Sequence, residues 1–149
     1  MKKQIPGLNG GRRGGRRDDD DGTSGDDLWA RARAAIVAHW PSGSSERWVL
    51  YLDPLLHGAG DETPAGVLNT TALVGFVDEQ PGANWHHACH YELWDPDTDV
   101  VHSRPASQPP LAMAVPSSWR VAWRPSGAKD WQLLPFAPTT DKQTANQVN

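Results

Sequence analysis

Residues 71–77 read Thr-Ala-Leu-Val-Gly-Phe-Val. Apolar side chains occupy both the odd and the even positions of this stretch, which is typical of a β-strand that is buried on both of its faces. Such a strand needs a hydrogen-bonded neighbour on each side and a covering layer above and below it. The stretch therefore predicts the centre of a sheet, and the sheet is the fold's main element.

Further segments on either side of this stretch favour the extended conformation, because they are dense in aromatic and β-branched residues. The segments are residues 47–52, 86–95, 99–103, 119–124 and 131–136. Between the second and the third lies Asp-Pro-Asp-Thr, with Pro96 where its fixed φ suits a type I turn, so these two strands are expected to form a hairpin. The chain shows no alternation of strand and helix, which favours antiparallel pairing.

One helix is expected before the strands. Apolar and aromatic side chains recur there at spacings of three and four, and Pro41 ends the pattern. The residues that draw this face are Leu28, Ala32, Ala35, Ile36, His39 and Trp40. The predicted fold class is therefore α+β, with one N-terminal amphipathic helix packed on a mostly antiparallel sheet or small barrel of about six strands.

The two ends of the chain differ in composition from its middle. Residues 1–26 hold six Lys and Arg and five Asp with almost no large apolar side chain, and residues 139–149 are also polar, so both are expected to be disordered tails. Residues 27–138 carry all eight tryptophans and form the expected single globular β-rich domain. Outside the first 26 residues, the chain has eight basic and 13 acidic residues. That balance disfavours nucleic acid and anionic membranes as partners.

The number of cysteines and the hydropathy of the chain indicate the cellular compartment. Cys89 is the single cysteine of the 149 residues, which excludes an intramolecular disulfide. The Met-Lys-Lys start is not followed by the apolar stretch of a signal peptide, and no apolar run approaches the roughly 20 residues of a membrane helix. We expect a cytoplasmic protein with no membrane partner.

The densest group of reactive side chains is the stretch Asn-Trp-His-His-Ala-Cys-His-Tyr-Glu at residues 84–92. Alternate residues of a strand share a face. His87 and Cys89 should therefore point to one side of the sheet, and His86, His90 and Glu92 to the other.

The hairpin adds a third candidate to the first side. If Trp94 lies opposite Asp99, then Tyr91 lies opposite His102, and His102 joins His87 and Cys89 within reach of side chains that converge diagonally. This register is an assumption, since a shift of one residue would send His102 to the other face.

Three interpretations of His87, Cys89 and His102 remain open. They hold zinc, with His57 or Asp78 as a further ligand. Alternatively, His102 or His87 activates the thiolate of Cys89 for catalysis. In the third interpretation Cys89 is a small core residue and the histidines lie at the rim of the sheet. The third is favoured, because the spacing matches no zinc or nucleophile motif. An enzyme is therefore not expected, and zinc is the one cofactor that remains possible.

The remaining candidates indicate a contact surface. Trp85 follows a Gly-containing turn beside the histidines, and it is expected to be exposed with His86, His90, Asp78 and Glu79 around it. The sequence favours a small accessory domain that binds another protein through this aromatic, His-rich surface. One alternative is the zinc or cysteine-dependent enzyme, and another is contact with RNA through the Gly/Arg tail.

Overall fold

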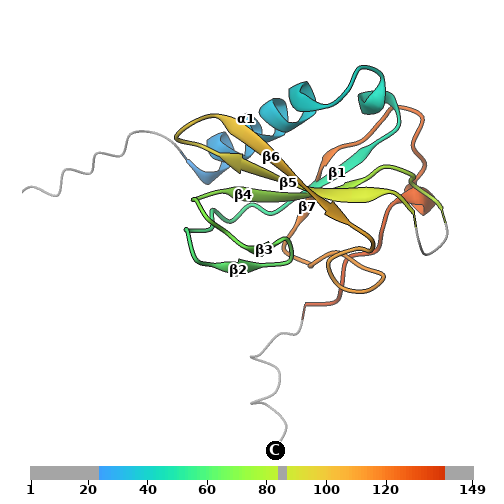
Figure 1. Cartoon of the computed structure of the whole chain (residues 1–149). Helices are drawn as coiled ribbons and strands as arrows, with labels where there is room; N and C mark the ends of the chain where they lie inside the picture. The colour runs from blue at the N-terminus through green and yellow to red at the C-terminus, as the bar shows by residue number, and fades with distance from the viewer. Residues whose placement is uncertain (1–23, 84–86, 140–149) are drawn as a thin grey trace, which may run out of the picture.

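Strand β4 (Leu73–Asp78) is the central strand of an open five-stranded sheet in a computed structural model that describes residues 24–83 and 87–139 (Figure 1). The strand order is β6-β5-β4-β1-β7, and every pairing is antiparallel. The other four strands are β1 (Val49–Leu52), β5 (Cys89–Asp95), β6 (Val100–Ala106) and β7 (Arg120–Trp123). All six residues of β4 are buried, as the sequence predicts for this stretch.

Helix α1 (Gly25–His39) covers one face of the sheet (Figure 1). It begins where the Ser24 side chain accepts a hydrogen bond from the Asp27 N–H, which satisfies one of the first amides of the helix. It ends before Pro41, which lacks an amide to continue it. Residues of the helix that are four positions apart are buried, and they pack onto apolar side chains of the sheet. This side of the core consists of Ala32, Ile36, Trp40, Leu50, Leu52, Leu73, Val77, Trp94 and Ala122.

The opposite face of the sheet is covered without a long helix. A short hairpin of β2 (Glu62–Thr63) and β3 (Gly66–Val67) covers one end, and the Arg104 guanidinium on β6 donates to the carbonyls of Ala65 and Val67. The rest is covered by two irregular segments, residues 107–119 and 130–137, which we call the irregular layer. The second segment includes η2 (Asp130–Gln132), while the other short helix, η1 (Ser44–Glu46), precedes β1.

Main-chain hydrogen bonds join the two segments of the irregular layer, and a hydrogen bond to a tyrosine side chain ties the layer to the sheet. Val115 donates to the Pro135 carbonyl and accepts from Ala137, which makes a parallel bridge to Phe136. The Leu134 N–H donates to the Tyr51 hydroxyl at 2.7 Å. Burial raises the pKa of that tyrosine to about 12, so it stays protonated at neutral pH. The layer therefore has a defined position on the sheet.

The structure differs from the sequence-based prediction in two elements. Residues 131–136, which were expected to be a strand, form the end of η2 and one isolated bridge. The strands β2 and β3 lie outside the segments that were expected to be strands. The sheet is open, with β6 and β7 at its two edges, so it is not a barrel. Pro105 lies within β6, which an edge strand can tolerate because proline lacks the amide that an inner strand needs.

Among the residues that the structure describes, no helix is both long and apolar enough to cross a membrane.

Gly75 at the middle of β4 lets two leucines of β1 approach the sheet backbone. A Cβ at this position would lie 2.9 Å from Leu50 Cδ1 and 3.3 Å from the Tyr51 carbonyl oxygen. We expect Gly75→Ala to lower the free energy of unfolding by about 1–3 kcal/mol, because these neighbours would have to shift within a packed core. Urea denaturation measures the change. Gly127→Ala is the matched control, since nothing lies within 4 Å of its Cβ position, and an equal effect of both substitutions would contradict the interpretation.

Candidate functional site: a histidine beneath an apolar pocket

The chemistry-bearing residues gather where β4 ends and β5 begins. Asp78 is the register partner of Cys89 in the antiparallel pair, and the Glu79 amide donates to the Ala88 carbonyl one step further along. Because successive residues of a strand point to opposite faces, Asp78 and Cys89 face the irregular layer, whereas Glu79 and His90 face the helix side. The end of this strand pair therefore carries two separate clusters, one on each face of the sheet.

The first cluster contains His87, Asp78 and Cys89. His87 Nε2 lies 2.9 Å from Asp78 Oδ1, and the two side chains are 5% and 1% exposed. Asp78 is the one polar neighbour of the His87 ring among the described residues, and the other ring nitrogen, Nδ1, has no partner there. Burial raises the pKa of Asp78, although the Gln80 amide and the charge of His87 act in the opposite direction.

Cys89 lies beneath this pair as a core residue that is 5% exposed. Burial, with the carboxylates of Asp78 and Glu79 nearby, raises the pKa of its thiol to about 11. A nucleophilic cysteine needs the opposite environment, with a cation or a helix N-terminus that stabilises the thiolate. The arrangement has the features of the structural cysteine in the third interpretation.

His102 lies away from these residues. The hairpin pairs Asp95 with Val100, so Leu93 and not Tyr91 is opposite His102, a register two residues from the one assumed above. An even shift keeps His102 on the same face as Cys89, but it places the two four positions apart along the strands, or roughly 13 Å. His102 is exposed there. The structure therefore brings His87 close to the Asp78–Cys89 pair and leaves His102 out.

The turn between the two strands explains this register. Its four residues end at Asp99, which adopts a positive φ of 56° and donates its N–H to the Asp95 carbonyl. The carboxylate of Asp99 accepts the Trp94 indole N–H at 2.7 Å. An aspartate tolerates this left-handed backbone because its short side chain finds a local partner.

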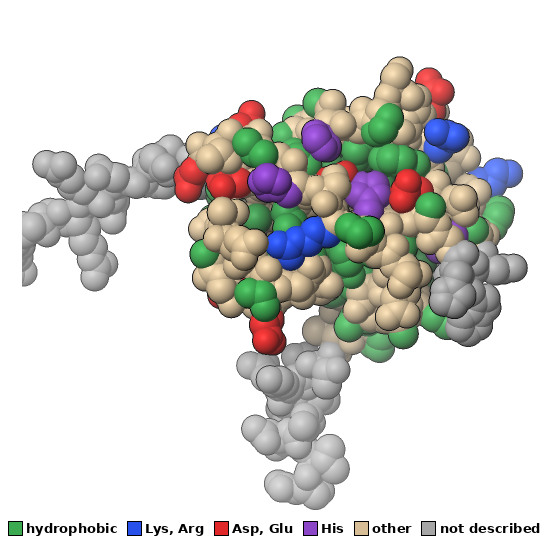
Figure 2. Space-filling view, viewed as in Figure 1, with side chains coloured by type: hydrophobic (Ala, Val, Ile, Leu, Met, Phe, Trp, Pro, Cys, Tyr) green, Lys and Arg blue, Asp and Glu red, His purple; other side chains and the backbone are tan. Residues whose placement is uncertain are grey.

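His57 is also distant from the first cluster. Its bridge partner is Ala72, just before β4, at the end of the strand opposite Asp78. Its Nε2 lies 2.7 Å from Asp53 Oδ2. Figure 2 shows histidine side chains at separate places on one face of the molecule, not in one group. Within residues 24–83 and 87–139, no group of three or more His, Cys, Asp or Glu is arranged to hold a metal ion.

The second cluster, on the helix side, is a connected polar network around His90. His90 Nε2 lies 2.7 Å from Glu92 Oε1, and its Nδ1 lies 3.2 Å from Glu79 Oε2. The Ser103 hydroxyl donates to the other Glu92 oxygen at 2.6 Å. Burial alone would lower the pKa of His90, but the bonds and charges of Glu92 and Glu79 outweigh it and raise the pKa.

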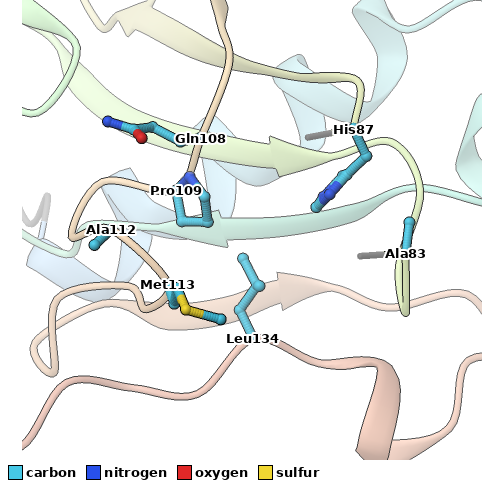
Figure 3. A pocket seen from close by; sticks show the side chains of 7 residues that line it. All are labelled: Ala83, His87, Gln108, Pro109, Ala112, Met113 and Leu134. Atoms are coloured by element: carbon cyan, nitrogen blue, oxygen red, sulfur yellow. The ribbon is translucent and has the colours of Figure 1, made fainter. Parts of the chain in front are cut away.

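A pocket opens above the first cluster, at the irregular layer (Figure 3). Its cavity volume is about 170 Å³, and the His87 ring points into it. Apart from His87 and Gln108, the wall is apolar and consists of Ala83, Pro109, Ala112, Met113 and Leu134. The sequence pattern indicates His87 but not the other lining residues, because a Pro-rich irregular segment has no periodicity that would show which side chains face inward.

Trp85 and His86, the other two predicted contact residues, lie outside the described residues. Asp78 is too deeply buried to contact a partner directly, whereas Glu79 and His90 are partly exposed.

Comparison of the chain with models of protein families, with curated proteins and with solved structures finds no match in any of the three.

The environment of Cys89 predicts a slow reaction with iodoacetamide at pH 8. A thiol with a pKa of about 11 is about 200-fold less ionised at this pH than a free cysteine. We expect alkylation of the native protein to be at least about 200-fold slower than that of the urea-unfolded chain, as followed by mass spectrometry. Equal rates in the two states would instead identify Cys89 as a reactive thiol.

The network around His90 predicts a pH-dependent contribution to stability. Because the pKa of His90 is raised on folding, its stabilising effect is fully present below the unfolded value of about 6.5 and is lost as the pH rises through the folded value. His90→Gln should therefore lower the free energy of unfolding by about 1 kcal/mol more at pH 5.5 than at pH 9. Urea titrations at both values measure it, with the exposed His102→Gln as the control. A deficit that does not change with pH would contradict the linkage.

Proposed function

We propose that this chain is a small accessory domain that binds another protein through the irregular layer and the adjoining residues 79–83 and 87–88. One observation carries the proposal. An apolar pocket lies at the surface beside exposed apolar side chains of the same layer. These side chains are Leu111, Met113, Trp131 and Phe136, which are 48%, 57%, 71% and 42% exposed.

Such a surface has the composition of a protein contact. Exposed aromatic and methionine side chains around a pocket are enriched where partner side chains insert, and charged residues are scarce among the residues that line it. Met113 lies at the pocket itself (Figure 3). Its neighbour Ala112 holds a positive φ of 52°, a strained conformation for a residue with a Cβ, and such strain is concentrated at binding sites.

The charge of the domain indicates what kind of partner would approach it. The described residues carry 13 Asp and Glu against seven Lys and Arg. An acidic domain attracts a basic partner over long range, while the apolar pocket supplies the contact once they meet. We place this binding in the cytoplasm, where a single buried thiol stays reduced.

Substitution at the pocket rim tests the proposal. A photo-crosslinking amino acid at position 113 identifies the partner in the cells that produce the protein, and the affinity of the purified pair is then measured. We expect Met113→Glu to weaken binding by at least about tenfold, because it places a charge where apolar surface is buried. Met113 is 57% exposed, so the fold should not change.

The matched control is Leu55→Glu. Leu55 is 61% exposed and lies beyond the end of β1 that is opposite the Asp78 end of the sheet. The affinity of the Leu55→Glu variant for the partner should stay within about twofold of that of the unsubstituted protein. Equal weakening by both substitutions, or by neither, would contradict a binding surface at the irregular layer. Binding that disappears when residues 1–23 are deleted would assign it to the N-terminal tail.

A further inference from the structure

A second pocket lies on the helix side of the sheet, where the end of α1 meets β5 and the edge strand β6. Its cavity volume is about 320 Å³, and we call it the helix-side pocket. In contrast to the pocket on the opposite face, its wall combines aromatic rings with acidic and other polar side chains. The main lining residues are Trp40, Trp48, Glu79, His90, Glu92 and Ser103.

Two indole rings form one wall of the helix-side pocket. Trp40 directly follows α1 and Trp48 directly precedes β1, and their ring centroids are 5.3 Å apart with an angle of 68° between the ring planes. The Trp48 ring also contacts the His90 ring, with 5.2 Å between the centroids. Trp40 is buried, whereas Trp48 is partly exposed. Trp48 therefore offers aromatic surface to an occupant, and an indole ring attracts cations more strongly than any other aromatic side chain.

The charge of the pocket also favours a cation. His90 lies between the carboxylates of Glu79 and Glu92, so it balances at most one of their two negative charges. Among the described residues that line this pocket, none is a lysine or an arginine. Glu92 is 2% exposed and is held by His90 and Ser103, but Glu79 is 24% exposed. Because a carboxylate has about four lone-pair sites, Glu79 has acceptor capacity for a ligand beyond its contact with His90.

The domain already uses the contact that this site would provide. Arg31 and Arg33 of α1 place their guanidinium carbons 5.2 Å and 5.3 Å from the ring centroids of Trp94 and Trp123. Within the part of the chain that the structure describes, no cation lies over Trp40 or Trp48 in the same way. The indole wall of the helix-side pocket is therefore open to a cation from another molecule.

The walls of the pocket favour a guanidinium group over other cations. A guanidinium is planar, weakly hydrated and rich in N–H donors, so it can lie against an indole and bind a carboxylate at the same time. A lysine ammonium is more strongly hydrated, and a quaternary ammonium has no N–H for Glu79. A metal ion is disfavoured, because no group of three or more His, Cys, Asp or Glu among the described residues is arranged to hold one.

We propose that the helix-side pocket binds an arginine side chain of another protein or peptide, with its guanidinium group against the Trp48 indole and hydrogen-bonded to the Glu79 carboxylate. The excess of acidic side chains in the described residues attracts basic segments toward the domain. The pocket lies on the face of the sheet opposite the irregular layer, so this inference goes beyond the proposed function and does not depend on it.

The test uses three acetylated and amidated tripeptides, Gly-X-Gly, in which X is arginine, lysine or citrulline, the neutral isostere of arginine. Each is titrated into the full-length protein at pH 8, and binding is followed by shifts of backbone and indole N–H signals in ¹H–¹⁵N spectra. We expect the arginine peptide to bind at least about tenfold more tightly than the citrulline peptide, because the cation–π contact and the charge-assisted hydrogen bonds need the charge. It should bind about threefold more tightly than the lysine peptide.

Two substitutions and a matched control locate the binding. Glu79→Gln should weaken the arginine peptide about tenfold and change the citrulline peptide less than about twofold. Trp48→Phe should weaken the arginine peptide about threefold, because phenylalanine attracts cations less than tryptophan does. The control is Glu46→Gln, which removes the same charge from an exposed residue of η1 outside the pocket. Its affinity for the arginine peptide should stay within about twofold of that of the unsubstituted protein.

Several outcomes would overturn the inference. Equal affinity for the arginine and citrulline peptides, or equal weakening by Glu79→Gln and Glu46→Gln, would show only a general attraction to an acidic domain. Tighter binding of a trimethyllysine peptide than of the arginine peptide would assign the pocket to a quaternary ammonium group. Met113→Glu, which tests the proposed function, should change arginine binding less than about twofold, because it lies on the other face of the sheet. Loss of arginine binding in that variant would place the peptide at the irregular layer instead.

Discussion

The burial of β4 on both of its faces is the constraint on which the rest of the structure depends. Its six residues make two layers possible, because their side chains pack alternately against α1 and against the irregular layer. Gly75 contributes by having no side chain, since the space on the helix side is occupied by Leu50 and Leu52 from β1. A strand that is buried on both faces also needs a hydrogen-bonded neighbour at each edge. β1 and β5 are these neighbours, which places β4 at the centre of the strand order.

The same constraint separates the two polar clusters. Asp78 and Glu79 are adjacent in sequence, but at the end of a doubly covered strand they point to opposite layers. Asp78 contacts His87, which lies just before β5, and Glu79 contacts His90 on β5. His87, Cys89, His90 and Glu92, which look like one reactive group in the sequence, therefore belong to two groups with the sheet between them. The first cluster pairs one histidine with one carboxylate, whereas the second places one histidine between the carboxylates of Glu79 and Glu92.

The sequence predicts those parts of the structure that depend on periodicity. The apolar pattern of residues 71–77 corresponds to β4, the spacing from Leu28 to Trp40 to α1, and strand alternation correctly separates His87 and Cys89 from His90 and Glu92. The hairpin register could not be obtained in this way. The register depends on the positive φ of Asp99 and on the hydrogen bond from the Trp94 indole to Asp99. These features select one turn among several of similar energy.

The pocket is the part that the sequence could not reveal. Its wall comes from a Pro-rich segment near Pro109 and from Leu134, and their approach to each other depends on the bridge between Val115 and Phe136. A single parallel bridge between irregular segments has no sequence pattern, because neither segment alternates. The prediction of a strand at residues 131–136 fails for the same reason. Apolar residues there pack down onto Tyr51 and Val115 instead of pairing along an edge.

The two histidines differ in how many polar neighbours surround their rings. His90 has more polar neighbours, but its nitrogens and the Ser103 hydroxyl are all used within the network, so it already has what a buried histidine needs. His87 is more deeply buried, and its one polar neighbour among the described residues is Asp78. A leucine at position 87 would remove a polar neighbour of the buried Asp78 carboxyl group, which costs free energy because a buried polar group needs partners. His87 and His90 therefore each satisfy a buried carboxyl group at the same end of the strand pair, one on each face of the sheet.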